Sequence, residues 1–170
     1  TYKTANGNWV MPRDVAIVEG KLLKNESREI IVEGPPEKMS KSKKNVIEPD
    51  EILENYGIDS TRIFMISDSP PDRELEWTDE GIQGSKNLVN RIERYFLQEE
   101  TVLSEDTNKN IEKYVHEMEN NILDFSLNKC VANIYTLFNF LEKSKVYLNN
   151  NNLSKKILIC MNPILPRLTS

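Results

Sequence analysis

The feature that most constrains this sequence is a lysine-rich run that follows Gly34-Pro35-Pro36. Four lysines fall within the seven residues 38–44, among serines and a methionine. The run lacks the hydrophobic period of a helix or a strand, so it predicts a loop over residues 35–45. This loop separates a part of the chain with strand-like patterns from a later part with helical patterns.

The residue types of this loop suit a phosphate group. Lysine ammonium groups on a flexible loop are mobile point charges that match phosphate oxygens, and serine hydroxyls and backbone N–H groups add hydrogen bonds. Met39 is the only apolar residue from Glu37 to Asn45 and can anchor the loop to a neighbouring surface. Such a loop can close over a triphosphate and stabilise charge on a leaving pyrophosphate. The alternative for a lysine-rich run is a solvated loop or a nuclear-import-like patch.

Residues 1–36 predict a small β unit with little core of its own. Asn6-Gly7 is a strong signal for a tight hairpin turn between residues 3–5 and 8–10. Two β-branched runs, at 15–18 and 29–32, predict further strands, and Gly20 and Asn25 interrupt the stretch between them.

Residues 49–68 predict two short helices. Pro49 suits a first helical turn, Gly57 a helix end, and Asp59 an N-cap for the second helix. Ser69-Pro70-Pro71 ends that second helix.

From residue 79 onward the pattern predicts a helical bundle. The Asn149–Asn152 run predicts a polar linker before a fourth helix that opens at Ile157. Three earlier runs have apolar residues at helical spacing, namely Ile82, Val89, Ile92 and Phe96; Ile111, Tyr114, Val115, Met118 and Ile122; and Leu127, Val131, Ile134, Phe138 and Leu141.

Composition excludes several classes of protein. Hydrophobic content is 38% and net charge is −5, which fits a folded chain and restricts any nucleic-acid contact to a local surface. We expect no membrane span, since no apolar run is long enough, and a cytoplasmic location. Cys130, Cys160 and the only histidine, His116, have no zinc-site spacing, so we expect no metal site and two buried thiols. Without an initiator Met or a final helix stop, both ends are expected to be cuts in a longer protein.

The order of residues in the loop resembles one family closely. Lys38-Met39-Ser40-Lys41-Ser42 is similar to the signature loop of class I aminoacyl-tRNA synthetases, and Asn45, Val46-Ile47-Glu48-Pro49, Tyr56-Gly57-Ile58-Asp59 and Arg62 match its downstream context. In that family the loop completes the ATP site of an enzyme that forms an aminoacyl adenylate and transfers the amino acid to tRNA. The resemblance implies that Lys41 contacts the ATP phosphates with Lys38 assisting, that Met39, Ser40 and Ser42 belong to the ATP-binding loop, and that Mg accompanies ATP.

A second set of residues indicates which amino acid is activated. Leu75-Glu76-Trp77, with Ser69-Pro70-Pro71 before it and Gly81-Ile82-Gln83-Gly84 after it, resembles bacterial leucyl-tRNA synthetases. Asn8-Trp9-Val10-Met11-Pro12 resembles their leucine-specific insertion. Methionyl, isoleucyl and valyl enzymes share the loop, but the Leu75-Glu76-Trp77 segment argues against them. A non-catalytic binding module is the other alternative, and it has no reason to keep an ordered signature loop.

The resemblance implies an α+β fragment in three parts: a leucine-specific insertion at 1–36, the signature loop with a mostly α-helical linker at 37–78, and an incomplete anticodon-binding helix bundle at 79–170. The implied partners are leucine and tRNA-Leu, and we expect a monomer. The family's His-Ile-Gly-His signature is absent and His116 cannot replace it, so we expect the chain by itself to be inactive.

Several side chains have a structural interpretation that we prefer. Trp9, Tyr56, Phe64 and Trp77 are expected to pack in small connecting cores. Arg62 can pair with Asp59 or a neighbouring carboxylate, or contact tRNA, and we expect the structural pairing. Arg167 stands where the family usually has histidine, which concerns bundle packing.

Overall fold

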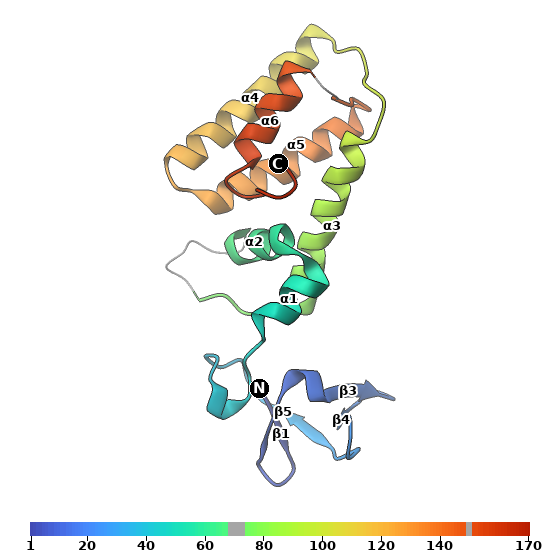
Figure 1. Ribbon diagram of the computed structural model, residues 1–170, viewed down its shortest axis with the longest axis vertical. Coiled ribbons are helices and arrows are strands. Elements are labelled where there is room, and N and C mark those ends of the chain that lie inside the picture. The colour runs from blue at the N-terminus through green and yellow to red at the C-terminus, as the bar shows by residue number, and fades with distance from the viewer. Residues whose placement is uncertain (68–73, 149–150) are drawn as a thin grey trace. The chain divides into compact units, whose positions relative to one another are not determined.

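A computed structural model describes residues 1–67, 74–148 and 151–170. It confirms the α+β class, with short strands first and helices after them (Figure 1). The chain divides into two compact units, Thr1–Ile52 and Leu53–Ser170, and the boundary lies within the helix α1 (Pro49–Tyr56). Each unit is described by itself below.

The first unit contains two small antiparallel sheets. One has the order β2-β1-β5, from β1 (Tyr2–Thr4), β2 (Trp9–Val10) and β5 (Ile31–Glu33), with Tyr2 opposite both Val10 and Glu33. The other pairs β3 (Val15–Val18) with β4 (Lys21–Lys24). A short 3-10 turn, η1 (Pro12–Asp14), connects them.

The predicted hairpin is confirmed, although its strands are short. Gly7 has φ +83, and its N–H donates to the Thr4 carbonyl at 2.9 Å. The run at 15–18 forms β3 as expected, whereas the run at 29–32 forms a strand only from Ile31. The strand β4 was not expected, because its two leucines lie between lysines and have no alternating pattern.

The two short helices after the loop are confirmed as α1 and α2 (Ile58–Ser67). Gly57 separates them with φ +80, a conformation that glycine adopts without a steric penalty. The Ser69-Pro70-Pro71 prediction lies outside the described residues.

Four further helices follow: α3 (Asp79–Phe96), α4 (Glu105–Leu123), α5 (Leu127–Lys143) and α6 (Asn152–Met161). Thr78, Ser104 and Asn151 cap α3, α4 and α6, since each side-chain oxygen accepts an N–H from the first turn. The fourth helix thus begins before Ile157, because the end of the asparagine run supplies its cap.

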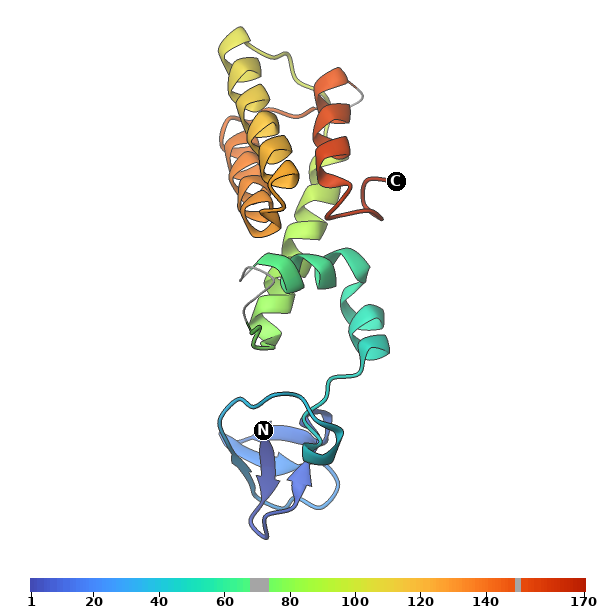
Figure 2. The same ribbon diagram turned by 90° about the vertical axis from the view of Figure 1, so that its left-hand side faces the viewer.

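A single hydrophobic core joins these helices. In both views α4 runs alongside α5 and α6 (Figures 1 and 2). Of the three predicted apolar runs, the members buried in this unit are Ile82, Val89, Ile92, Ile111, Val115, Met118, Val131, Ile134, Phe138 and Leu141. Phe96, Tyr114, Ile122 and Leu127 are half-buried. The helical spacing therefore identified the core face of each helix.

Helix α2 holds the turn that follows α6. Asp59 is buried, and its carboxylate accepts N–H groups of Leu168 at 2.7 Å and Arg167 at 3.3 Å. The predicted N-cap role of Asp59 is therefore wrong: it lies inside the first turn of α2, whose start its side chain does not cap.

The predicted carboxylate partner of Arg62 is also wrong. Its guanidinium donates to the carbonyls of Ile164 at 3.0 Å and Pro163 at 2.6 Å, and no ion pair includes it among the described residues. Carbonyls just beyond a helix C-terminus have no intrahelical donor, which explains why a cation lies there.

Trp77 and Gly81, from the segment that resembles leucyl enzymes, lie where α2 and α3 pack together. These two helices cross in Figure 2. The Trp77 ring meets the buried Phe64 ring edge-to-face, with centroids 5.0 Å apart. A Cβ on Gly81 would approach a Phe64 ring carbon to 2.6 Å, so glycine permits the close crossing. These contacts confirm the packing interpretation of Trp77 and Phe64. Trp9 and Tyr56 are half-buried, and a lysine ammonium lies over each ring.

The hydroxyl of Tyr95 organises the connection between α5 and α6. It donates to the Val146 carbonyl at 2.9 Å and accepts the Leu148 N–H at 3.0 Å. All three residues are buried, and burial raises the pKa of Tyr95. Both backbone groups belong to buried residues, where a polar group without a partner is costly, so the hydroxyl matters for stability.

Tyr95→Phe should lower the free energy of unfolding by about 1–3 kcal/mol, because it leaves a buried donor and a buried acceptor unsatisfied. Urea denaturation of the two proteins measures the difference. Tyr114→Phe is the matched control, since the half-buried Tyr114 hydroxyl has no hydrogen bond among the described residues. Its cost should stay below about 0.5 kcal/mol. Equal losses in the two variants would contradict the assignment.

Both cysteines are free and buried, as the sequence predicted. Cys130 lies on α5 and Cys160 on α6. Burial raises the pKa of the Cys130 thiol to about 11, and burial together with Glu119 raises the pKa of Cys160. Little thiolate therefore forms at neutral pH.

At pH 8 both thiols should react with a disulfide reagent about 100-fold more slowly in the native protein than in urea. The cause is twofold, since burial blocks access and keeps the thiols protonated. The native rate should still increase between pH 8 and pH 10, because the folded Cys130 pKa of about 11 lies above that interval. A colorimetric thiol assay checks both points, and a native cysteine that reacts as fast as in urea would refute them.

Candidate functional site

The lysine-rich loop follows β5 and belongs to the first unit. The Gly34 N–H donates to the Thr1 carbonyl at 2.8 Å, and the Thr1 hydroxyl donates to the Pro35 carbonyl at 3.1 Å. A Cβ on Gly34 would lie 2.8 Å from that hydroxyl oxygen. The start of the loop is therefore attached closely to the three-stranded sheet.

Within the loop the backbone makes one tight turn. Ser40 is extended, η2 (Lys41–Lys43) is a single 3-10 turn, and Lys44 follows with φ +50 in the left-handed region. The N–H groups of Lys43 and Lys44 donate to the carbonyls of Ser40 and Lys41 at 3.1 and 3.2 Å. A lysine has a Cβ, so the left-handed conformation of Lys44 costs about 1 kcal/mol relative to glycine.

The side chain of Asn45 closes this turn. Its Oδ1 accepts the Ser40 N–H at 2.7 Å, and its Nδ2 donates to the carbonyls of Glu37 at 3.1 Å and Lys38 at 3.3 Å. Asn45 was part of the sequence resemblance, but no role was predicted for it. The available signal was its residue type, since asparagine side chains often bond to nearby backbone in turns.

The four lysines differ in their surroundings. Lys43 pairs with Glu37, and this hydrogen bond is the main cause of the lowered pKa of Glu37. Lys38, Lys41 and Lys44 are exposed, and no ion pair includes them in the described parts of the chain. Three ammonium groups on this turn therefore remain accessible to an anion.

The other predicted site residues lie on the same turn. The hydroxyls of Ser40 and Ser42 are hydrogen-bonded to each other at 2.8 Å. Met39 is 49% exposed, so it does not anchor the loop by burial within this unit. The structure thus brings Lys38, Met39, Ser40, Lys41 and Ser42 together on one backbone turn.

The described residues contain no group of three or more His, Cys, Asp or Glu side chains placed to hold a metal ion. His116 lies on α4 with its side chain 72% exposed, near Glu119 at 3.7 Å. It is therefore a surface histidine. Over the same residues, no helix combines the length and the apolar character needed to span a bilayer.

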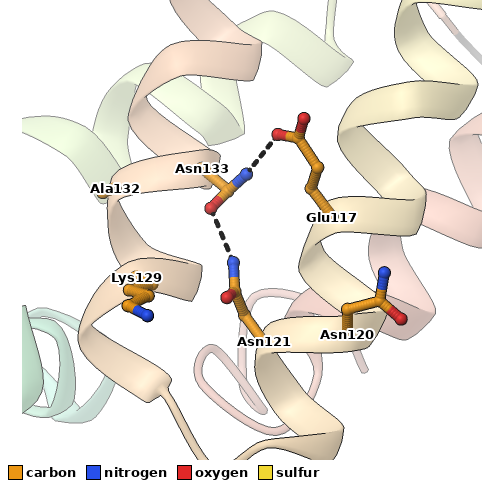
Figure 3. Close-up of a pocket in the computed structure, with 6 residues that line it drawn as sticks. All are labelled: Glu117, Asn120, Asn121, Lys129, Ala132 and Asn133. Atoms are coloured by element: carbon orange, nitrogen blue, oxygen red, sulfur yellow. Dashed lines mark hydrogen bonds between the residues drawn. The ribbon is translucent and has the colours of Figure 1, made fainter.

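The second unit has a depression of about 380 Å³ lined mostly by polar side chains. It lies between α4 and α5 (Figure 3). The Asn133 amide accepts from Asn121 and donates to Glu117, both at 2.9 Å. Lys129, Asn120 and Ala132 complete the lining. The polar groups satisfy one another across two helices, so this network explains helix pairing and offers no nucleophile with an adjacent base.

A family model describes residues 26–78 of the chain, as "tRNA synthetases class I (I, L, M and V)". This match includes the whole lysine-rich loop, α1 and α2.

Individual relatives extend the likeness to nearly the whole chain. Leucine–tRNA ligase of Zymomonas mobilis is 36% identical over an alignment of 173 residues. The alignment covers 99% of this chain and 20% of that protein. The enzyme of Rickettsia bellii is 33% identical, with 99% of this chain and 22% of its own length covered. The enzyme of Rhodospirillum centenum is 49% identical over 94 residues, or 55% of this chain and 11% of its own length. The chain spans about a fifth of the first two relatives and about a tenth of the third.

A solved structure agrees with the fold. LeuRS of Agrobacterium radiobacter, in a ternary complex with tRNA and LeuAMS, superimposes with a TM-score of 0.63 over 77% of this chain and 19% of that chain. At 18% identity, this likeness concerns the fold alone.

All three of these relatives are named leucine–tRNA ligases, the family that the Leu75-Glu76-Trp77 segment resembles. Over nearly its whole length, the chain is therefore similar in sequence to one segment of the leucine–tRNA ligases, and residues 26–78 match the class I tRNA synthetase model.

Proposed function

We propose that this chain is part of a leucine–tRNA ligase, which activates leucine with ATP as leucyl-adenylate and transfers it to tRNA-Leu. The observation that carries the proposal is the lysine-rich turn at 38–44, which lies within the class I family match and has three accessible ammonium groups. A binding module without catalysis would not need this ordered turn.

The turn contributes electrostatic stabilisation. Lys41 contacts the ATP phosphates and Lys38 assists, while Met39, Ser40 and Ser42 belong to the same ATP-binding turn. Negative charge develops on pyrophosphate as it leaves, so an ammonium group fixed near it lowers the barrier to adenylate formation. The Lys43–Glu37 pair leaves the other lysines available, because Glu37 already has a cationic partner.

The remaining parts of the proposal follow the family plan. Residues 1–36 are the leucine-specific insertion, 37–78 the loop and linker, and 79–170 part of a bundle that binds tRNA. A monomer in the cytoplasm is the expected state. Mg²⁺ prefers oxygen ligands, whereas the turn presents mainly ammonium groups, so these residues do not fit a magnesium site of their own.

The proposal is tested with the full-length protein in pyrophosphate–ATP exchange. Leucine should support exchange, and methionine, isoleucine and valine should support it far less, by at least about 100-fold in kcat/KM. Exchange that is fastest with another of these amino acids would reject leucine as the substrate. No exchange with any of the four would reject the enzyme assignment.

Lys41→Ala in the full-length enzyme should lower kcat for leucine-dependent exchange by about 100-fold, and weaken ATP binding by less than about threefold. A group that acts mainly in the transition state changes kcat in this way. Exchange kinetics give kcat, and titration with ATP in a calorimeter gives the ATP affinity. The matched control is Lys21→Ala, an exposed lysine on β4 in the same unit, which should leave both unchanged. A loss confined to ATP affinity would exclude the role.

A further inference from the structure

The conformation of the lysine-rich turn is not fixed by hydrophobic burial. Every residue from Pro36 to Asn45 is exposed or half-exposed, and its one apolar side chain, Met39, is 49% exposed. The first unit has only two buried apolar side chains among its described residues, Val10 and Ile31, both in the three-stranded sheet. Hydrogen bonds therefore have to select the shape of the turn.

The Asn45 amide provides three of these bonds. They connect the end of the turn to its start, at the Glu37 and Lys38 carbonyls, and to its middle, at the Ser40 N–H. The 3-10 turn and the left-handed Lys44 reverse the chain so that Asn45 reaches back to these groups. The amide thus holds the backbone on both sides of Met39 and immediately before Lys41.

We propose that Asn45 is a positioning residue, which holds the Lys38 and Lys41 backbones in the arrangement that a triphosphate requires. This inference rests on the proposed function of the turn as an ATP-phosphate loop. Asn45 itself touches no reacting atom. Its two donors and one acceptor fix where the flexible lysine side chains begin, which reduces the number of loop conformations that compete with the productive one.

The test compares three variants of the full-length enzyme. Asn45→Ala removes all three bonds, and Asn45→Asp keeps the acceptor for the Ser40 N–H but places an oxygen against the two carbonyls. The control Asn25→Ala removes a single side-chain bond, from Nδ2 to the Arg13 carbonyl at 3.0 Å, elsewhere in the same unit. Leucine-dependent exchange gives kcat and KM, and thermal unfolding gives the midpoint of each protein.

Both Asn45 variants should lose about 10- to 100-fold in kcat with the KM for leucine unchanged. The control should stay within about twofold of the unmodified enzyme. Full activity of Asn45→Ala would overturn the proposal. Full activity of Asn45→Asp would also overturn it, because the bonds to the two carbonyls would then be unnecessary.

Limited trypsin digestion gives a readout that does not depend on activity. Cleavage after Lys38, Lys41, Lys43 and Lys44 should be about tenfold faster in Asn45→Ala than in Asn25→Ala, since a released loop fits a protease more readily. If the rate of loop cleavage is unchanged in Asn45→Ala, the positioning role of Asn45 is refuted, even if the activity of this variant falls. If the unmodified enzyme shows no leucine-dependent exchange, the proposed function fails, and faster loop cleavage would still show that Asn45 holds the turn.

Discussion

The attachment of the C-terminal turn to α2 is the constraint on which the second unit depends most. Asp59 and Arg62 lie on neighbouring turns of this helix and make four hydrogen bonds to backbone groups of residues 163–168. The carboxylate is buried and has only N–H donors, so losing them would leave a charge without compensation. Ile63, the residue after Arg62, is fully buried in the core formed with the bundle helices. Asp59 and Ile63 are four residues apart and lie on one face of α2, so the polar contacts and the apolar burial stabilise the same packing.

The two units are stabilised in different ways. In the second unit, apolar side chains from five helices share one core, and single polar groups such as the Tyr95 hydroxyl complete it. The first unit has short strands and few buried side chains, so hydrogen bonds determine its local shape. This difference explains why a substitution in the bundle should change the free energy of unfolding, whereas one at Asn45 should change the conformation of a single loop.

The sequence predicted those features that depend on local chemistry. The Asn6-Gly7 turn, the stop at Gly57 and the apolar faces of α3, α4 and α5 follow from backbone preference and helical period, and all three are confirmed. The partners of Asp59 and Arg62 were not predictable, because they lie about 100 residues further along the chain. The strand β4 was missed since its position depends on pairing with β3, which no pattern within Lys21–Lys24 reveals. For the site, the motif identified the turn, but its residue-by-residue roles stay predictions.

The site combines a fixed backbone with mobile charges, and this division follows from its residue types. The Asn45 amide is short, so it restrains the backbone with little loss of side-chain freedom. Lysine has a long stem, so its ammonium group can follow a phosphate oxygen that moves during the reaction. If the lysine side chains were held as firmly as the backbone, their ammonium groups would match the phosphate charges at only one stage of the reaction. If the backbone were disordered before ATP binds, the entropy lost when the turn becomes ordered would offset part of the binding free energy from the lysine–phosphate contacts. The observed turn is held at its ends and exposes Lys38 and Lys41 between them, an arrangement that meets both requirements.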